Sequence, residues 1–369
     1  MKYYLIAGER SGDLHASHLM QELKKQDPAA QFRFWGGDMM QAQGGELVVH
    51  YQELAIMGFI EAVANIFKIA GYLRKCRHDI LEYKPDVVIL VDYAGFNMRI
   101  AKFCKEHGIK TFFYISPKIW AWNEGRVEGV KANIDRMFTI LPFETEFYQK
   151  HNYKVDYVGN PIADTVAEHP VNPNFRKDND LPDKPIIAIL PGSRKQEIEA
   201  MLHFMVSIVP SFQDYQLVIA AVSNMDSSYY EAFRRDDLVK IVYDQTYDLL
   251  AHSEAALVTS GTATLETALF NVPQVVCYKG SMASYLIARA VIKVKFISLV
   301  NLIAGRQIVP ELIQEKFKAT YMIQELKKIL NDKEARQAQL DGYAELKAKL
   351  GQQQAAAKAA QLMVGYLKE

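Results

Sequence analysis

The stretch VVILVDYAGFN, residues 87–97, decides how the amino-terminal half of the chain folds. It begins with five apolar residues, four of them β-branched, which run directly into Asp92. A short and uniformly apolar run of this kind is typical of a parallel strand that is buried on both faces. Ligands of parallel sheets bind beyond the carboxyl ends of the strands. Asp92 is therefore expected at a functional edge, although a capping or structural carboxylate would satisfy the same position.

Short apolar runs of the same kind alternate with helical patterns on both sides of this strand. Before residue 165 the runs are KYYLIAG, QFRFWG, KTFFYIS, RMFTIL and KVDYVG, and after residue 185 they are IIAILPG, YQLVIAA, VKIVYD, AALVTSG and QVVCYKG. Strands that alternate with helices predict βαβ units, and therefore an α/β fold with parallel sheets.

The chain is expected to form two doubly wound domains. The segment AEHPVNPNFRKDNDLPDKP, residues 167–185, has four prolines and many charges, which is typical of a linker or surface loop. We place the first domain at residues 1–165 and the second at residues 166–330. Residues 331–369 are expected to be helical and either to cross back to the first domain or to mediate association.

The charge balance and the cysteines exclude several classes of protein. The 43 basic side chains equal the 43 acidic ones and the pI is about 7.1, so no global field would recruit nucleic acid. The three cysteines lie far apart without a CxxC pair, which argues against a zinc site or a disulfide scaffold and favours a reducing cytosol. The amino-terminal apolar run meets Glu9 too soon for a signal peptide or an anchor. No window has the roughly 18 uncharged apolar residues of a membrane-spanning helix.

The first unusual loop is AGERSGD, residues 7–13, directly after the first expected strand. Gly8 and Gly12 let the chain turn tightly and approach a ligand, but their spacing is not GxGxxG, so a dinucleotide site is only weakly indicated. Glu9 and Asp13 are expected to point into the crevice beyond the sheet. The alternative is a turn that one of the polar residues caps.

A second loop, LPGSRKQEI at residues 190–198, joins an expected strand to an expected helix. Its Gly-Ser-Arg order places Arg194 where a guanidinium can meet a phosphate at a helix amino terminus. The alternative is that Arg194 only pairs with Glu197 or Glu199 across the helix.

A third loop, VTSGTATLETALF at residues 258–270, opens a helix with small polar residues. Ser260, Gly261 and Thr262 offer free backbone N–H groups, which predicts a cradle for a diphosphate. Glu266 lies about one turn further along the helix and would reach a ribose diol. The alternative is a plain capping sequence.

A fourth segment, SLVNLIAGRQIVPEL at residues 298–312, is an apolar run that Asn301, Gly305 and Arg306 interrupt. A core strand would not normally carry these three residues. Alone they are a weak signal, and they gain meaning beside the other motifs.

Taken together, these segments resemble the lipid-A-disaccharide synthase family, glycosyltransferases of the GT-B type. The resemblance covers nearly the whole chain through AGERSGD, ELAIMGFIE, PDVVILVDYAGFN, YISPKIWAWNEGR, LPFE, LPGSR, SGTATLE and NLIAGR. It implies two Rossmann-like domains that face an interdomain cleft. It also implies transfer of 2,3-diacylglucosamine from UDP to the 6-hydroxyl of 2,3-diacylglucosamine 1-phosphate, which gives a β-1,6 disaccharide with inversion at the anomeric carbon.

The resemblance assigns roles to individual residues. Inversion needs a base that removes the acceptor proton. Asp92 matches the strand-end aspartate of the family and is the first choice, with Glu9 as the runner-up. The UDP-sugar is expected on the second domain, at Arg194, Ser260, Gly261, Thr262, Glu266, Asn301, Gly305 and Arg306. The acceptor and its acyl chains are expected on the first domain, at Gly12, Asp13, Met57, Asn97, Ser116, Trp120, Trp122 and Arg126.

No metal ion or other cofactor is expected. In GT-B sites helix amino termini and basic side chains stabilise the leaving diphosphate, and the sequence lacks a DxD pair in a suitable loop. Arg194 and Arg306 are the expected cations.

Two positions depart from the family pattern. Gly95 stands where the family commonly has a second acid, so that acid cannot be indispensable here. Asn123 stands where the family often has Arg, which makes phosphate binding at that position doubtful and leaves Arg126 as the nearest guanidinium.

Because both substrates carry acyl chains, the resemblance implies a peripheral enzyme in the cytoplasm, on the inner face of the inner membrane of a Gram-negative-type bacterium. Residues 54–73, followed by RKCRH, form an apolar face that ends in basic charge, as interfacial helices do. Residues 282–297 are a second candidate. Each segment is equally compatible with a core-facing helix that has a solvated basic end. The oligomeric state is left open.

Two other classes of function remain open at this point. The chain could be another UDP-sugar enzyme of the same architecture, such as a UDP-N-acetylglucosamine transferase or 2-epimerase, and an epimerase needs no acceptor. It could instead be a non-catalytic nucleotide-binding regulator, or a response module in which Asp92 accepts a phosphoryl group. A response module needs adjacent acids after the first strand, whereas Glu9 and Asp13 are separated by three residues.

Overall fold

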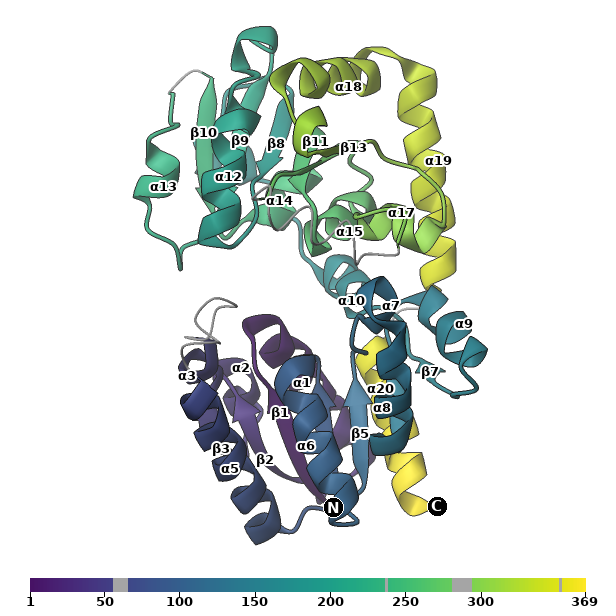
Figure 1. The fold of residues 1–369 in the computed structure, drawn as a ribbon. Coiled ribbons are helices and arrows are strands. Elements are labelled where there is room, and N and C mark those ends of the chain that lie inside the picture. The colour runs from purple at the N-terminus through teal and green to yellow at the C-terminus, as the bar shows by residue number, and fades with distance from the viewer. Residues whose placement is uncertain (56–65, 236–237, 281–293, 352–353) are drawn as a thin grey trace. The chain divides into compact units, whose positions relative to one another are not determined.

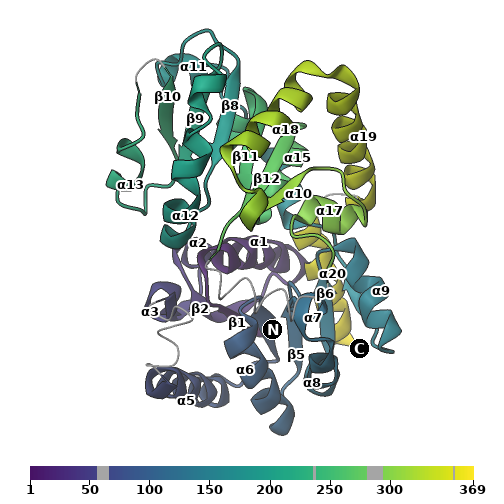
Figure 2. The same ribbon diagram turned by 45° about the horizontal axis from the view of Figure 1, so that its top comes forward.

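The computed structural model describes residues 1–55, 66–235, 238–280, 294–351 and 354–369, which form two compact units. The first unit comprises Met1–Pro161 together with Gln352–Glu369, and the second comprises Ile162–Gly351. In each unit, helices lie on both faces of a sheet (Figure 1, Figure 2).

The first unit is built on a seven-stranded parallel sheet in the order β3-β2-β1-β4-β5-β6-β7. Its strands are β1 (Lys2–Ala7), β2 (Gln31–Gly36), β3 (Glu46–His50), β4 (Val87–Val91), β5 (Thr111–Tyr114), β6 (Arg136–Thr139) and β7 (Asp156–Tyr157). Its helices are α1 (Arg10–Gln26), α2 (Asp38–Ala42), α3 (Tyr51–Ala55), α5 (Ile66–Tyr83), α6 (Ala94–Glu106), α7 (Ile119–Trp122), η1 (Glu124–Arg126), α8 (Val127–Asn133), α9 (Pro142–Lys150) and α20 (Ala355–Lys368). Every residue of β4 is fully buried, which confirms the strand predicted there.

The order of strand addition reverses between β1 and β4. Strands β2 and β3 add to one side of β1, whereas β4 to β7 add to the other side. Doubly wound sheets bind their ligands beyond the carboxyl ends of the strands at such a reversal. The loops that follow β1 and β4 carry Glu9 and Asp92, so the topology places both residues at this edge.

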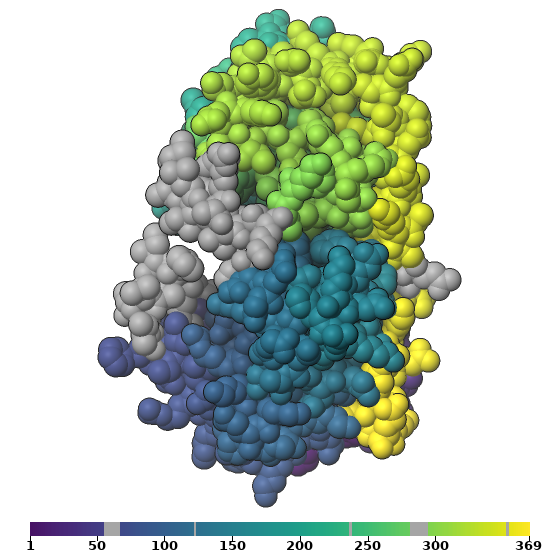
Figure 3. Space-filling model, turned by 45° about the vertical axis from the view of Figure 1, so that its right-hand side comes forward, coloured from purple at the N-terminus to yellow at the C-terminus, as the bar shows by residue number. Residues whose placement is uncertain are grey.

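Two hydrophobic cores cover the faces of this sheet. One contains Leu19 of α1 together with Ala359 and Met363 of α20, all fully buried. The other contains Ile100 of α6 and Val130 of α8. Helix α20 packs on α1, and in the space-filling view its yellow residues lie beside the blue residues of the first unit (Figure 3). The carboxyl-terminal helix is therefore an integral part of the first unit.

The second unit is built on a six-stranded parallel sheet in the order β10-β9-β8-β11-β12-β13. Its strands are β8 (Ile186–Leu190), β9 (Gln216–Ala221), β10 (Val239–Tyr243), β11 (Ser253–Thr259), β12 (Gln274–Tyr278) and β13 (Glu311–Ile313). Its helices are α10 (Pro161–Glu168), which begins at the last residue of the first unit, α11 (Phe175–Asp178), α12 (Lys195–Val206), η2 (Val209–Ser211), α13 (Ser228–Glu231), α14 (Thr246–Ala251), α15 (Thr262–Leu269), α17 (Leu299–Ala304), η3 (Gln314–Lys316), α18 (Ala319–Asn331) and α19 (Lys333–Leu350). The same reversal, here between β8 and β11, places the loops that carry Arg194 and Ser260 at one edge.

Helix α19 is joined to the second unit by buried polar contacts. The side chain of Gln339 accepts the N–H of Gln274 at 2.9 Å, and the hydroxyl of Tyr343 donates to the carbonyl of Val272 at 3.2 Å. The predicted helical tail, residues 331–369, is thus shared between the two units. The first unit ends at Pro161, slightly before the boundary predicted at 165.

The predicted fold class is confirmed: the chain forms two doubly wound α/β units, and its carboxyl-terminal region is helical. None of the helices in the described ranges combines the length and the apolar character that crossing a bilayer requires.

Candidate functional site

Asp92 is the first residue after β4, and its backbone is held in a left-handed conformation. Its φ is 47°, and that of the following Tyr93 is 46°. The side-chain amide of Asn97 donates to the carbonyl of Asp92 at 2.8 Å, and the N–H of Asp92 donates to the carbonyl of Tyr114 at 3.0 Å. Strained conformations of non-glycine residues cost roughly 1–3 kcal/mol each and collect at functional sites. These hydrogen bonds hold Asp92 at the carboxyl edge of the sheet.

The electrostatic surroundings of Asp92 suit a base. Burial raises the pKa of its carboxyl above the ordinary value of 3.8. The positive charge of Lys118 and the N–H of Tyr93 act in the opposite direction and favour the ionised form. A raised pKa makes a carboxylate a stronger base toward a hydroxyl proton.

The loops after β1 and β4 touch each other through Tyr93. A methyl group on Gly8 would lie 2.3 Å from Cδ1 of Tyr93, so the ring rests directly on the glycine backbone. Burial and the negative charge of Glu9 both raise the pKa of Tyr93, which places Glu9 near the same ring. The structure therefore brings Glu9 and Asp92 together on neighbouring loops of the first unit.

Asp13 has a structural role, which corrects its predicted place among the acceptor contacts. Its side chain is almost completely buried. The carboxylate accepts three backbone N–H groups around the start of α2, those of Gly37 at 2.6 Å, Met39 at 3.1 Å and Met40 at 3.2 Å. It therefore caps α2 and holds the loop after β2, rather than capping its own turn.

Gly12 and Asn97, also predicted to contact the acceptor, pack inside the first unit. A methyl group on Gly12 would lie 3.3 Å from Cβ of Ala7, so the glycine allows α1 to approach β1 closely. Asn97 is fully buried, and its amide donates to the carbonyls of Val91 and Asp92. Both residues shape the edge without offering a side chain to a ligand.

A buried carboxylate that was not among the predicted site residues, Glu144, organises the loop after β5. It accepts the hydroxyl of Ser116 and, at 3.1 Å, the indole N–H of Trp120. Its other oxygen accepts the N–H groups of Ile140 and Leu141 at 3.3 and 3.0 Å. Ser116 and Trp120 are thus buried supports of this loop, and their roles as acceptor contacts stay predictions. The motif LPFE carried the signal, because a Glu at the third helical position commonly reaches back to the cap.

Three further acceptor predictions lie around or beyond this loop. Residues 119–122 form the short helix α7, which carries both tryptophans. The side chain of Trp122 and the whole of Met57 lie outside the described part of the chain. Arg126 is exposed at the end of η1, and its acceptor role stays a prediction.

In the second unit, the loop after β8 is held by Glu197 of the following helix, α12. Gly192 has a φ of 103°, and the side chain of Glu197 accepts the N–H groups of Ser193 and Arg194 at 3.2 and 3.3 Å. The guanidinium of Arg194 lies 3.6 Å from Glu197 and is 76% exposed. The pair with Glu197 is therefore present, and the phosphate role of Arg194 stays a prediction. The exposed guanidinium remains able to meet a phosphate.

In the loop after β11, one residue is hydrogen-bonded within the protein and the next two are exposed to solvent. The hydroxyl of Ser260 donates to the carbonyl of Ile297 at 2.9 Å, and its N–H donates to the carbonyl of Cys277 at 3.0 Å. Gly261 and Thr262 are exposed at the start of α15, and a methyl group on Gly261 would meet nothing within 4 Å. The open part of the predicted cradle is therefore the backbone of these two residues.

Glu266, one turn into α15, is half-buried beside an aromatic ring. It accepts the hydroxyl of Tyr247 at 3.1 Å. Burial raises the pKa of Glu266, and the hydrogen bond from Tyr247 acts against this rise. Tyr247 was absent from the predicted site because no local motif links it to Glu266.

The side-chain amide of Asn301 is hydrogen-bonded on both its atoms inside the second unit, so its nucleotide contact stays a prediction that these bonds do not favour. Its nitrogen donates to the carbonyl of Val309 at 2.9 Å and to Glu311 at 2.8 Å. Its oxygen accepts the N–H groups of Ile308 and Val309 at 2.7 and 3.0 Å. Asn301 therefore ties α17 to the segment that leads into β13.

Gly305 and Arg306 complete this motif. Gly305 ends α17 at a φ of 74°, and its N–H donates to the carbonyl of Asn301 at 2.9 Å. Arg306 pairs with Glu345 of α19 at 2.7 Å, with both side chains about half exposed. An exposed pair of this kind contributes little, so a phosphate could replace Glu345. The nucleotide role of Arg306 stays a prediction.

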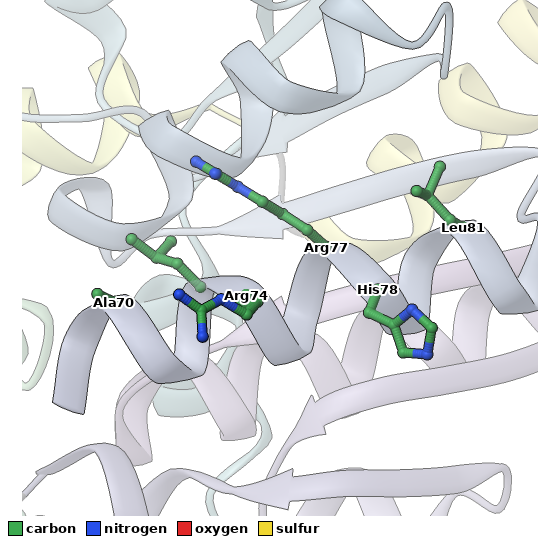
Figure 4. Close-up of a pocket in the computed structure, with 6 residues that line it drawn as sticks. Ala70, Arg74, Arg77, His78 and Leu81 are labelled. Atoms are coloured by element: carbon green, nitrogen blue, oxygen red, sulfur yellow. The ribbon is translucent and has the colours of Figure 1, made fainter. Parts of the chain in front are cut away.

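A shallow groove runs along α5 in the first unit. It is lined by Ala70, Leu73, Arg74, Arg77, His78 and Leu81, all from this one helix (Figure 4). Phe67, near the start of the helix, is 91% exposed. The helix thus presents apolar and basic side chains together on its outer surface.

The described ranges contain no cluster of three or more His, Cys, Asp or Glu side chains that could hold a metal ion. The expectation that the reaction needs no metal ion stays a prediction.

Comparisons with known proteins identify close relatives over the full length of the chain. The sequence model of a family described as lipid-A-disaccharide synthetase matches residues 3–364. The lipid-A-disaccharide synthase of Nitrosococcus oceani is 37% identical over 361 residues, which cover 94% of this chain and 92% of that protein. That of Myxococcus xanthus is 36% identical over 370 residues, which cover 98% of this chain and 97% of that protein.

Solved structures share the fold at low sequence identity. The S. aureus MnaA–UDP co-structure has a TM-score of 0.67 at 13% identity and covers 100% of this chain and 96% of its own. The UDP-GlcNAc 2-epimerase from Neisseria meningitidis bound to UDP-GlcNAc has a TM-score of 0.63 at 13% identity, with 100% of both chains covered. The glycotransferase of kitacinnamycin has a TM-score of 0.64 at 13% identity, with 99% and 98% covered. At these identities the likeness shows the fold alone, and the predicted GT-B architecture is confirmed.

Proposed function

The chain belongs to the lipid-A-disaccharide synthase family and is therefore a glycosyltransferase that forms the lipid A disaccharide; from this premise we propose which substrates and residues take part. The donor is UDP-2,3-diacylglucosamine and the acceptor is 2,3-diacylglucosamine 1-phosphate. The acceptor 6-hydroxyl attacks the anomeric carbon and UDP leaves, so the β-1,6 linkage forms with inversion. The match over residues 3–364 carries this conclusion.

Asp92 is the general base of this reaction. Support comes from its place at the strand reversal, from its fixed left-handed backbone and from the raised pKa of its carboxyl. As the acceptor oxygen attacks, Asp92 takes its proton, and the bond to UDP breaks with its electrons going to the diphosphate. Glu9, on the neighbouring loop, orients the acceptor or is the alternative base.

UDP binds at the strand reversal of the second unit. Glu266 accepts the ribose hydroxyls, and the backbone N–H groups at the start of α15 face the diphosphate. Arg194 and Arg306 supply positive charge. Each is an exposed guanidinium paired with a glutamate that a phosphate can displace. These groups stabilise the leaving diphosphate, so no metal ion is required.

The enzyme docks peripherally on a membrane through α5. Support comes from the exposed Phe67 and from Arg74, Arg77 and His78 around the groove of that helix. Apolar side chains that enter the lipid interface and basic ones that meet anionic headgroups are typical of interfacial helices. Docking on the inner face of the inner membrane would give access to acylated substrates. Of the first candidate segment, residues 54–73, positions 56–65 lie outside the described residues, and the second candidate, residues 282–297, falls mostly outside them.

The decisive experiment measures disaccharide and UDP together, with and without the acceptor. We expect UDP release only when the acceptor is present. Asp92→Asn should lower kcat by about 10²–10⁴-fold while the Kd for UDP stays within about twofold, because a base acts in the transition state. The acid limb of the pH profile of kcat/KM should lie above pH 3.8, since burial raises the pKa of Asp92.

Two outcomes would contradict these assignments. UDP release that ignores the acceptor would refute the synthase reaction. Normal turnover by Asp92→Asn would leave the reaction in place and move the base to Glu9.

A further inference from the structure

The tyrosine that contacts Glu266 in the second unit is itself packed against other aromatic rings. Tyr247, in the first turn of α14, donates its hydroxyl to Oε1 of Glu266 at 3.1 Å. The ring of Tyr247 meets His169 edge-on, with centroids 5.2 Å apart at 87°, and meets Phe270 at 5.3 Å and 51°. Contacts on two sides fix the plane of the tyrosine ring.

His169, which supports this ring, is itself anchored. Its Nε2 lies 3.2 Å from Oδ1 of Asp248, and the same oxygen accepts the N–H of Asn172 at 2.7 Å. Asp248 thus ties the segment after α10 to α14 next to Tyr247. Because the ring is held through this chain of contacts, the Tyr247 hydroxyl is kept against Glu266.

Glu266 needs such a donor. Within the described residues Tyr247 is its one hydrogen-bond donor, and no Lys or Arg of these ranges pairs with its carboxylate. Glu266 is half-buried, and a carboxylate that is partly withdrawn from water without a cation beside it depends on hydrogen bonds to keep its charge. One donor leaves further lone pairs on the two oxygens, and these accept hydroxyl groups well. The carboxylate of Glu266 can therefore accept further hydrogen bonds from the hydroxyl groups of a ligand.

We propose that Tyr247 is a positioning residue that orients Glu266 toward the ribose hydroxyls of the UDP moiety, and thereby makes the enzyme select ribonucleotides over 2′-deoxyribonucleotides. The inference rests on the proposed ribose role of Glu266 and deepens it. A glutamate side chain has several rotatable bonds, and ordering it on ligand binding weakens the affinity. A hydrogen bond from a locked tyrosine orders it beforehand.

Tyr247 also keeps Glu266 in the form that the ribose requires. Burial raises the pKa of the carboxyl and favours protonation, and the hydrogen bond from Tyr247 favours the ionised form. A protonated carboxyl would offer a donor where the ribose hydroxyls need an acceptor. Loss of the Tyr247 hydroxyl should therefore weaken the binding of nucleotides with a complete ribose more than that of 2′-deoxyribonucleotides.

The test uses UDP and 2′-deoxy-UDP as competitive inhibitors of disaccharide formation by the full-length enzyme. The wild type should bind UDP about tenfold more tightly than 2′-deoxy-UDP, as expected for one hydrogen bond to a charged group. Tyr247→Phe should weaken the binding of UDP about tenfold and that of 2′-deoxy-UDP about twofold, so that the two inhibition constants become similar. With saturating substrates kcat should stay within about twofold, because the lost contact is made equally in the ground state and the transition state.

Tyr243→Phe is the matched control. It also removes a tyrosine hydroxyl that donates to a glutamate, in this case Glu231 at 3.0 Å. Neither Tyr243 nor Glu231 is hydrogen-bonded to Tyr247 or Glu266 among the described contacts. It should leave both inhibition constants unchanged. Thermal unfolding of both variants confirms that each is folded under the assay conditions.

Two results would overturn the inference, and they differ from each other. If Tyr247→Phe weakens both nucleotides equally and keeps the wild-type ratio, Tyr247 is only a packing residue, and the ribose role of Glu266 stands. If Glu266→Gln also keeps the wild-type ratio, Glu266 does not read the ribose, and that part of the proposed function falls together with the inference.

Discussion

Asp92 combines a left-handed backbone with a half-buried carboxyl group, two features that each destabilise a fold. Asn97 and Tyr114 hold the backbone by hydrogen bonds, and both contacts depend on neighbouring strands and helices. The sequence predicted the position of Asp92 because a buried strand ends there. It did not predict the left-handed geometry, since no glycine marks the turn.

The cost of burying Asp92 can be measured through its pH dependence. The folded-state pKa of Asp92 is raised above the unfolded value of about 3.8, so its contribution to stability is fully present below that pH and is lost as the pH rises through the folded pKa. Asp92→Asn should therefore have a higher Tm than the wild type at pH 7–8, and the difference should shrink toward pH 4. Differential scanning calorimetry across this range measures both curves.

Asp244→Asn is the control for this experiment. Asp244 also stands in a left-handed conformation, at a φ of 55° after β10, and Asn tolerates that conformation well. The control measures the rise in Tm that Asn brings to a left-handed backbone position by itself. A gain in Asp92→Asn that is the same at pH 4 and pH 8 would show that burial of the charge is not its source.

Several polar residues in the recognised motifs turned out to bind other parts of the protein. Ser116 and Trp120 donate to Glu144, and Asn301 binds the segment that leads into β13. In a sequence, a polar residue at a strand end looks the same whether it meets a ligand or a buried partner. Only the position of the distant partner decides between the two.

Among the elements, helix α5 shows how much the spacing of apolar residues can predict about which sides of a helix are buried. The apolar face and the basic end were visible in the sequence, and they fitted both a core helix and an interfacial one. One side of α5 packs in the core and another faces solvent, and membrane contact by the solvent-facing side stays a prediction. Cys76 and Ile80 are buried in the core, while Phe67 and Arg74 are exposed.

The docking role of α5 can be tested with lipid vesicles. Phe67→Ala combined with Arg74→Ala should weaken sedimentation with vesicles of anionic phospholipid about tenfold or more, since burying a Phe contributes roughly 1.5–3 kcal/mol and a basic residue about 1 kcal/mol. Turnover of short-chain, soluble substrate analogues should be unaffected.

Tyr321→Ala provides the matched control, because Tyr321 is an exposed aromatic residue on α18 in the second unit. It should sediment with vesicles like the wild type. Unchanged sedimentation of the α5 double variant would show that α5 does not carry the contact.

At the scale of the whole molecule, the chain leaves the first unit at Pro161 and returns to it at Gln352. The returning helix α20 contributes Ala359, Ala360 and Met363 to a core that also holds Leu19 of α1. Completion of the first unit therefore requires residues from both ends of the chain. Its folding involves contacts of very long sequence separation, which are slow to form.

The contribution of α20 can be measured by removing one buried side chain. Met363→Ala should destabilise the first unit by about 2–4 kcal/mol, because Met363 is fully buried and a cavity would remain. All three tryptophans lie in the first unit, so urea denaturation followed by tryptophan fluorescence reports on that unit.

Gln361→Ala, at an exposed position of the same helix, should leave the fluorescence transition in place. If Met363→Ala also leaves it in place, α20 does not contribute to the stability of the first unit.

The sequence by itself determined the α/β class, the strands other than β3 and β13, the strand-end position of Asp92 and the family. These features are local: a buried strand needs a run of apolar residues, and a motif needs a fixed spacing. The tertiary structure decided the order of the strands, the division of the carboxyl-terminal helices and the partners of the polar side chains. Tyr247 and Glu266, like Ser116 and Glu144, meet across many residues of intervening chain. Hydrogen bonds between distant segments leave no periodic trace in the sequence, because they form only where packing brings the segments together.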